Sequence, residues 1–267
     1  MWRVLFMKKL FSFTIMILLI NLNLPIYSQN KSGDNSFERV QKLGTLKVCS
    51  QAGFIPFEMK DNKGNWKGFD VDIMTEFAKQ NSIKLQLIDT TLDGLIPALM
   101  TGKCDMIASG LTITEERKKA VLFSKPVFTV IVTAALLDTP ENRSKYKTFS
   151  DIDSKGTKIA THTGSAATLY LKSILKNANH LQFDTESDEV NAVVQKRTNV
   201  FVEDNVFIAQ ASKEMKIDFY TLLSNEKGDL AMAVRKKDIQ LIEKFNDFLD
   251  KLKKNGQYDS IKKNYFN

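Results

Sequence analysis

The chain has 267 residues, of which 43% are hydrophobic, so it can bury one large core or two modest ones. The formal net charge is +7 at pH 7, but the lysines are scattered among acidic neighbours and form no block with interleaved aromatic residues. This pattern excludes nucleic acid as an expected partner. Because no CxxC motif or cluster of histidine and cysteine occurs, we expect no metal. We expect no other cofactor either.

The N-terminus has the layout of a secretory signal peptide. Arg3, Lys8 and Lys9 precede an apolar run at residues 10–20, and a polar segment follows. Residues 1–28 are therefore expected to be a removable leader of a protein exported to the periplasm. The alternative is an uncleaved membrane anchor, although the run is shorter than the roughly 20 apolar residues of a comfortable span.

Beyond an N-terminal tether at residues 29–42, strand-like and helix-like segments alternate, which indicates an α/β protein. In the first half we expect strands at 46–50, 84–88 and 105–109 and helices at 69–80 and 94–101. A long β-branched run at 127–137 follows. The pattern then restarts with strands at 157–161, 181–183 and 200–202 and helices at 166–175, 189–195 and 207–211. The chain closes with a strand at 230–234, an amphipathic stretch at 239–252 and a short helix at 258–263.

Two cysteines, Cys49 and Cys104, border predicted strands of the same half. In an exported chain a disulfide between them is one alternative. The position of both beside strands of one half favours the other alternative, two unpaired cysteines.

Two α/β units joined by two extended segments, 127–137 and about 225–234, predict a bilobal protein in which the chain crosses twice. One lobe is expected to comprise residues 43–130 and 230–267, and the other residues 131–229 with the hinge segments. Ligands of such folds bind where strand carboxyl ends meet helix amino ends, so a cleft between the lobes is the expected site.

The segment 108–119 predicts a strand end, a turn and a helix with an arginine in its first turn. Thr112 and Glu115 have the spacing of a capping box, and Thr114 is a second candidate cap. The free backbone N–H groups of the helix start and the guanidinium of Arg117 can together hold both oxygens of a carboxylate. The plain alternative is a capped surface helix.

A complementary set of residues lies in the second half. The turn His162-Thr-Gly-Ser165 leads from a strand into a helix, and its glycine lets the backbone approach an anion. Glu203 and Asp204 follow a buried-looking strand, and Asp204 can bind a ligand ammonium. The alternatives are an ordinary turn capped by Ser165, and Asp204 as the cap of the next helix.

Over about residues 43–266, the chain resembles the extracytoplasmic solute-binding proteins of family 3, which bind polar amino acids for ABC importers. The motifs that carry the resemblance are, in chain order, Phe54-Ile-Pro-Phe-Glu58, Gly68-Phe-Asp-Val-Asp72, Gly94-Leu-Ile-Pro-Ala98, Cys104-Asp-Met-Ile-Ala-Ser-Gly110, the Thr-Ile-Thr-Glu-Glu-Arg run that ends at Arg117, Phe123-Ser-Lys-Pro126 and Asn255-Gly-Gln-Tyr258. The resemblance implies a type II periplasmic-binding-protein fold, a monomer that works with a membrane permease and an ATPase, and no enzymatic activity.

Carried over to this sequence, the resemblance implies that Arg117 pairs with the ligand α-carboxylate. Thr112 and the backbone at Gly110 would assist from the same lobe, and the backbone at Gly164 from the other. Asp204 would bind the α-ammonium.

Specificity is expected from the rest of the pocket. Phe54 matches an aromatic residue that stacks on the ligand side chain, and Leu92 matches a wall position. Gln51 stands where relatives that bind basic or amide ligands often have aspartate. His162 stands where many members of the family have glycine, in the turn that leads to the anion site.

The remaining pocket is expected to hold Phe54, Leu92, Gln51, Ala160 and Glu203, which supply apolar walls, one amide and, if Glu203 faces the cleft, one carboxylate. They favour glutamine or another neutral polar amino acid, with a basic amino acid next if Glu203 faces the cleft.

Half a site on each lobe implies that hinge closure completes the contacts to the ligand. Two other functions stay open. One is an enzyme of the cyclohexadienyl dehydratase type, in which Glu203 acts as a general acid, and the other is the input module of a sensor.

Overall fold

The computed structural model describes residues 34–266, so the predicted signal peptide lies outside the described residues. Residues 34–267 form one compact unit. Within the described part of the chain, no helix combines the length and the apolar character needed to cross a bilayer.

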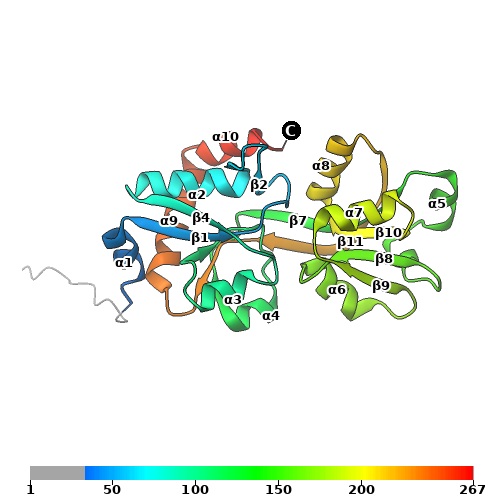
Figure 1. Cartoon of the computed structure of the whole chain (residues 1–267), viewed down its shortest axis with the longest axis horizontal. Coiled ribbons are helices and arrows are strands. Elements are labelled where there is room, and N and C mark those ends of the chain that lie inside the picture. Colours follow the sequence, from blue (N-terminus) through cyan, green and yellow to red (C-terminus); the bar gives the residue numbers. More distant parts are fainter. Residues whose placement is uncertain (1–33, 267) are drawn as a thin grey trace, which may run out of the picture. The chain divides into compact units, whose positions relative to one another are not determined.

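The first lobe contains a five-stranded sheet in the order β4-β1-β5-β12-β6. Strands β1, β4 and β5 are parallel, and β12 runs antiparallel to β5 and β6. The elements are α1 (Ser36–Leu43), β1 (Thr45–Ser50), β2 (Met59–Lys60), β3 (Trp66–Lys67), α2 (Phe69–Gln80), β4 (Lys84–Asp89), α3 (Leu95–Met100), β5 (Met106–Ile107), α4 (Glu115–Ala120), β6 (Val121–Phe123), β12 (Ala233–Arg235), α9 (Ile239–Lys254) and α10 (Gln257–Lys263). Helices α2 and α10 cover one face of this sheet and α3 the other (Figure 1).

The second lobe contains a sheet in the order β11-β7-β10-β8-β9, in which β10, β8 and β9 are parallel. Its elements are β7 (Phe128–Leu137), α5 (Pro140–Lys145), a 3-10 helix (Phe149–Ile152), β8 (Lys158–His162), α6 (Ala166–Ile174), β9 (Asn179–Phe183), α7 (Glu186–Val194), β10 (Val200–Asp204), α8 (Asn205–Met215) and β11 (Phe219–Leu230). Helices α7 and α8 lie on one side of the sheet and α6 on the other (Figure 1).

The two crossing segments, β7 and β11, pair with each other as an antiparallel ribbon (Figure 1). Phe128 pairs with Leu230 at one end and Leu137 with Phe219 at the other, with an irregularity between Leu223 and Lys227. The two-lobed α/β architecture is the predicted fold class. The second crossing strand begins earlier than the predicted segment at 225–234, because its first half is part of the second sheet.

The core of the first lobe forms where α2 packs against α9. Phe77 of α2 lies edge-on to Phe245 and Phe248 of α9, with ring centroids 5.4 and 5.2 Å apart. The apolar residues of both helices recur at helical spacing, which buries one stripe of each. This packing returns the C-terminal segment to the first lobe.

The second half of the predicted tether is helix α1. Phe37 and Val40 are buried on one face of α1, and the backbone N–H of Phe37 donates to Gln240 Oε1 of α9. Gly44 ends the helix in the left-handed conformation, with φ of 65°, which glycine adopts without a steric penalty. The segment before β1 is therefore docked onto the first lobe.

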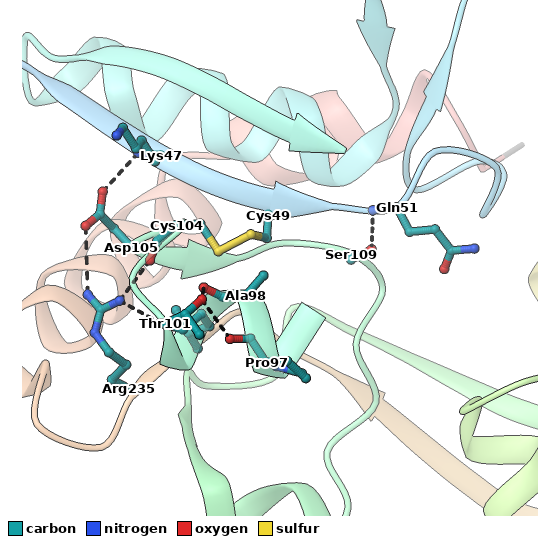
Figure 2. Close-up of a disulfide and its surroundings, with 11 residues drawn as sticks. Lys47, Cys49, Gln51, Pro97, Ala98, Thr101, Cys104, Asp105, Ser109 and Arg235 are labelled. Carbon is teal, nitrogen blue, oxygen red and sulfur yellow. Dashed lines mark hydrogen bonds and ion pairs between the residues drawn. A yellow bond between two sulfur atoms is a disulfide. The ribbon is translucent and has the colours of Figure 1, made fainter. Parts of the chain in front are cut away.

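Cys49 and Cys104 form a disulfide, so the expectation of unpaired cysteines is wrong (Figure 2). Strand β1 pairs with β5, with Cys49 beside Ile107, and this pairing brings Cys104, two residues before β5, next to β1. The Cα atoms are 5.6 Å apart, and both side chains are fully buried. Asp105 accepts a hydrogen bond from the N–H of Lys47 close by (Figure 2).

Removing this disulfide should lower the stability of the protein. The bond closes a loop of 55 residues, for which chain entropy predicts about 4 kcal/mol. We expect the Cys49→Ala/Cys104→Ala double variant to melt roughly 10 °C below the wild type in calorimetry. A double variant that melts at the wild-type temperature would show that the bond contributes nothing to stability.

Candidate ligand-binding site

A cavity of about 50 Å³ lies between the two lobes. Eight of the ten predicted site residues line it, namely Gln51, Phe54, Leu92, Gly110, Thr112, Arg117, Glu203 and Asp204. The cavity is also lined by nine residues that are not among the ten predicted site residues, namely Ser109, Val130, Val132, His162, Ser165, Ala166, Ala167, Glu186 and Gly228. Ala160 and Gly164 are not part of its wall.

Arg117 lies at the start of α4 and is 8% exposed. Thr114 caps this helix by accepting the backbone N–H of Arg117, so the predicted capping box of Thr112 and Glu115 is wrong. The guanidinium donates to the carbonyl of Thr112 at 2.8 Å and, across the cleft, to the carbonyl of Gly164 at 2.9 Å.

No carboxylate among the described residues lies within 4.0 Å of this guanidinium. Burial lowers the pKa of Arg117 to about 10, while the charges of Glu116 and Glu203 act in the opposite direction. A buried cation without an anionic partner is energetically costly. Arg117 is thus well suited to receive a ligand carboxylate.

Two glycines of the predicted site fix the surroundings of Arg117 and Phe54. Gly164 contributes the carbonyl that Arg117 bonds to. The N–H of Gly110 donates to Asp70 Oδ2 at 2.9 Å, so it is already used within the first lobe. A Cβ at Gly110 would lie 2.3 Å from Cε1 of Phe54, which means that only glycine leaves room for that ring.

Phe54 connects the two lobes. Its ring stacks on Phe57 of the first lobe at 5.2 Å and on Phe207 of α8 at 5.8 Å. Leu92 reaches the cavity from the core around the disulfide. Ala160, in contrast, is fully buried in the core of the second lobe, because strand β8 is covered on both faces.

Asp204 caps a helix with one carboxylate oxygen and leaves the other oxygen without a partner among the described residues. Its Oδ1 accepts the N–H groups of Val206 and Phe207 and so caps α8. Its Oδ2 is buried without a hydrogen-bond partner among the described residues. Burial raises the pKa of Asp204 to about 6. An ammonium group is the natural partner for such an oxygen.

Two further carboxyl groups line the cavity. Burial and the neighbouring charges of Asp204 and Glu186 raise the pKa of Glu203 well above its ordinary value. Glu186 is not among the predicted site residues. It is 4% exposed, and Gln51 Nε2 donates to both of its carboxylate oxygens, at 3.0 and 3.1 Å. It lies at the first turn of α7, three residues before the predicted helix start.

Buried acids behind the cavity support the part of its wall that the first lobe contributes. The backbone N–H of Gln51 donates to Ser109 Oγ (Figure 2), and Ser109 donates to Glu58 Oε1. Burial, and secondly the charge of Asp70, raise the pKa of the fully buried Glu58. The contact of Glu58 with Ser109 and the contact of Asp70 with Gly110 hold this wall in place.

These buried carboxyls predict how stability depends on pH. Burial raises the pKa of Asp70 and of Asp204 from 3.8 to about 6, so the folded chain binds more protons than the unfolded chain between these values. Their stabilising contribution is complete below about pH 4 and is lost as the pH rises through about 6. Each group accounts for roughly 3 kcal/mol.

Without added ligand, we therefore expect the free energy of unfolding in urea to fall between pH 4.5 and pH 7.5. The variant Asp204→Asn should show a smaller fall, because asparagine preserves the cap without titrating. A free energy of unfolding that rises throughout this range would contradict the assignment.

Two α/β lobes enclosing a cavity with a buried guanidinium and several carboxyls define a binding protein for a small polar ligand. The chain belongs to the bacterial extracellular solute-binding proteins of family 3, which its residues 46–267 match. This membership confirms the family resemblance and the type II periplasmic-binding-protein fold.

Named relatives cover most of the chain. It is 32% identical over 225 residues to a probable histidine-binding protein of Neisseria gonorrhoeae, covering 82% of each chain. It is 30% identical over 238 residues to the L-arginine-binding protein of Pseudomonas aeruginosa, covering 83% of this chain and 87% of the relative. The crystal structure of the ancestral amino acid-binding protein AncCDT-1, a precursor of cyclohexadienyl dehydratase, matches with a TM-score of 0.81 and 34% identity, over 87% of this chain and 100% of that one.

Proposed function

We propose that this protein binds a free basic L-amino acid in the cavity between its lobes and delivers it to an ABC importer. The observation that carries the proposal is a pair of unpartnered buried charges. Arg117 has no carboxylate within ion-pair distance among the described residues, and Asp204 Oδ2 has no hydrogen-bond donor there. The α-carboxylate and α-ammonium of an amino acid satisfy both.

The charges of the cavity favour a basic ligand over glutamine. Three carboxyl groups, those of Glu186, Glu203 and Asp204, line the cavity together with one guanidinium, that of Arg117. A basic amino acid brings a second cation to this acid-rich lining, whereas a zwitterion with a neutral side chain does not. The relatives named for histidine and L-arginine support this choice.

The family and the N-terminal sequence support the cellular role. A family of extracellular solute-binding proteins fits a chain whose residues 1–28 have the pattern of a leader, and we propose a periplasmic monomer. Its partners would be the permease and ATPase subunits that read its ligand-bound state.

An enzymatic function of the cyclohexadienyl dehydratase type has one observation in its favour. Glu203 is a buried cavity carboxyl whose raised pKa suits a general acid. Against it, the relatives carry the names of binding proteins, and AncCDT-1 is itself described as an amino acid-binding protein. Incubation with prephenate or arogenate distinguishes the two functions, because only the enzyme forms an aromatic product.

A thermal-shift screen of the amino acids tests the ligand class. Lysine, arginine, ornithine or histidine should raise the melting temperature most, because a ligand that binds only the folded state adds about 2.7 kcal/mol at a hundredfold excess over its Kd. Glutamine should give a smaller shift. A shift with glutamine alone would contradict the basic-ligand proposal.

Two substitutions test the paired charges. Arg117→Ala and Asp204→Asn should each weaken binding by about 2–5 kcal/mol in calorimetry, because each leaves one charged end of the ligand unpaired. Arg143→Ala is the matched control, since Arg143 is exposed on α5 and pairs with Asp138 away from the cavity. Wild-type affinity in Arg117→Ala would overturn the proposed site.

A further inference from the structure

We propose that Glu186 recognises the charged end of the ligand side chain, and that Gln51 and His162 position its carboxylate. This inference rests on the proposed basic-ligand function and assigns its specificity to one residue. Glu186 comes from the first turn of α7, and the wall opposite it comes from the end of β1.

Glu186 and Arg117 reach the cavity from different elements, Glu186 from α7 and Arg117 from α4. Thr112, whose carbonyl Arg117 contacts, also borders a groove beside the start of α4, whereas Glu186 borders a different groove, formed with residues 52–67 of the first lobe. An amino acid held at Arg117 and Asp204 would therefore extend its side chain towards Glu186.

Two side chains lie against the carboxylate of Glu186. His162 is 2% exposed; its Nδ1 lies 3.2 Å from Glu186 Oε1, and its Nε2 lies 3.1 Å from the carbonyl oxygen of Asp184. Anchoring at Asp184 fixes the ring against Glu186. Gln51 Nε2 contacts both carboxylate oxygens from the other lobe.

This arrangement leaves capacity for a ligand. A carboxylate offers about four acceptor positions, and among the described residues Glu186 Oε2 accepts only from Gln51. A guanidinium or ammonium entering the cavity can use the remaining positions. Because Gln51 and Glu186 belong to different lobes, the complete arrangement forms only when the lobes are in contact, which couples recognition of the charged side chain to closure.

The test compares ligands that differ in side-chain charge. L-Arginine and L-citrulline have nearly the same shape, but citrulline is neutral. Wild-type protein should bind arginine roughly tenfold to a hundredfold more tightly in calorimetry, the range of a hydrogen bond to a charged group. In Glu186→Gln this ratio should fall to about one, with citrulline affinity retained as proof of a folded site.

Asp188→Asn is the matched control. Asp188 lies on the same helical turn, is exposed and bonds to Thr185, so the substitution removes a carboxylate outside the cavity and should keep the wild-type ratio. His162→Asn should lower the arginine-to-citrulline ratio without changing citrulline affinity, as expected of a positioning residue.

The outcomes separate this inference from the proposed function. If the wild type binds no basic amino acid, the proposed function fails. If it binds arginine selectively but Glu186→Gln keeps the full ratio, the function stands and the assignment of Glu186 is overturned. Loss of the ratio in Glu203→Gln with retention in Glu186→Gln would assign the role to Glu203 and also overturn the assignment.

Discussion

The structure is organised around the burial of one guanidinium between two lobes. Arg117 is 8% exposed and donates to backbone carbonyls on both sides of the cleft, at Thr112 and Gly164. Carbonyl groups satisfy its hydrogen bonds but do not neutralise its charge, and an unneutralised charge in a low-dielectric interior is costly. Burial also disfavours the charged forms of the acids around Arg117, because it raises the pKa of Asp204 and of Glu203. A dipolar ligand relieves both penalties together.

The fold supplies this site through its connections. The ribbon of β7 and β11 joins the lobes, and Val130, Val132 and Gly228 of the ribbon line the cavity. Under the proposed hinge closure, movement of the lobes about the ribbon would open or close walls without displacing this lining. The stacked ring of Phe54, which contacts Phe57 and Phe207, and the Gln51–Glu186 contact are available only when the lobes meet. In the proposed function, closure and ligand selection would thus depend on the same side chains.

Local sequence patterns predicted much of this arrangement. Helix α2 has the expected bounds of 69–80 because its apolar stripe has a clear helical period, and Arg117 was identified from a helix start. Features that depend on contacts between distant segments could not be predicted from the sequence. The disulfide follows from the pairing of β1 with β5, which spacing does not encode. Glu186 was missed because an acid-rich first turn is also typical of a solvent-exposed helix start. Ala160 was placed in the wall although both faces of β8 are covered.

The most direct test of the account is a crystal structure of the protein with L-arginine bound. The account predicts that the α-carboxylate pairs with the guanidinium of Arg117 and that the α-ammonium donates to Asp204 Oδ2. A ligand bound elsewhere, or one whose charged ends contact neither residue, would contradict the central claim that these two buried charges define the site.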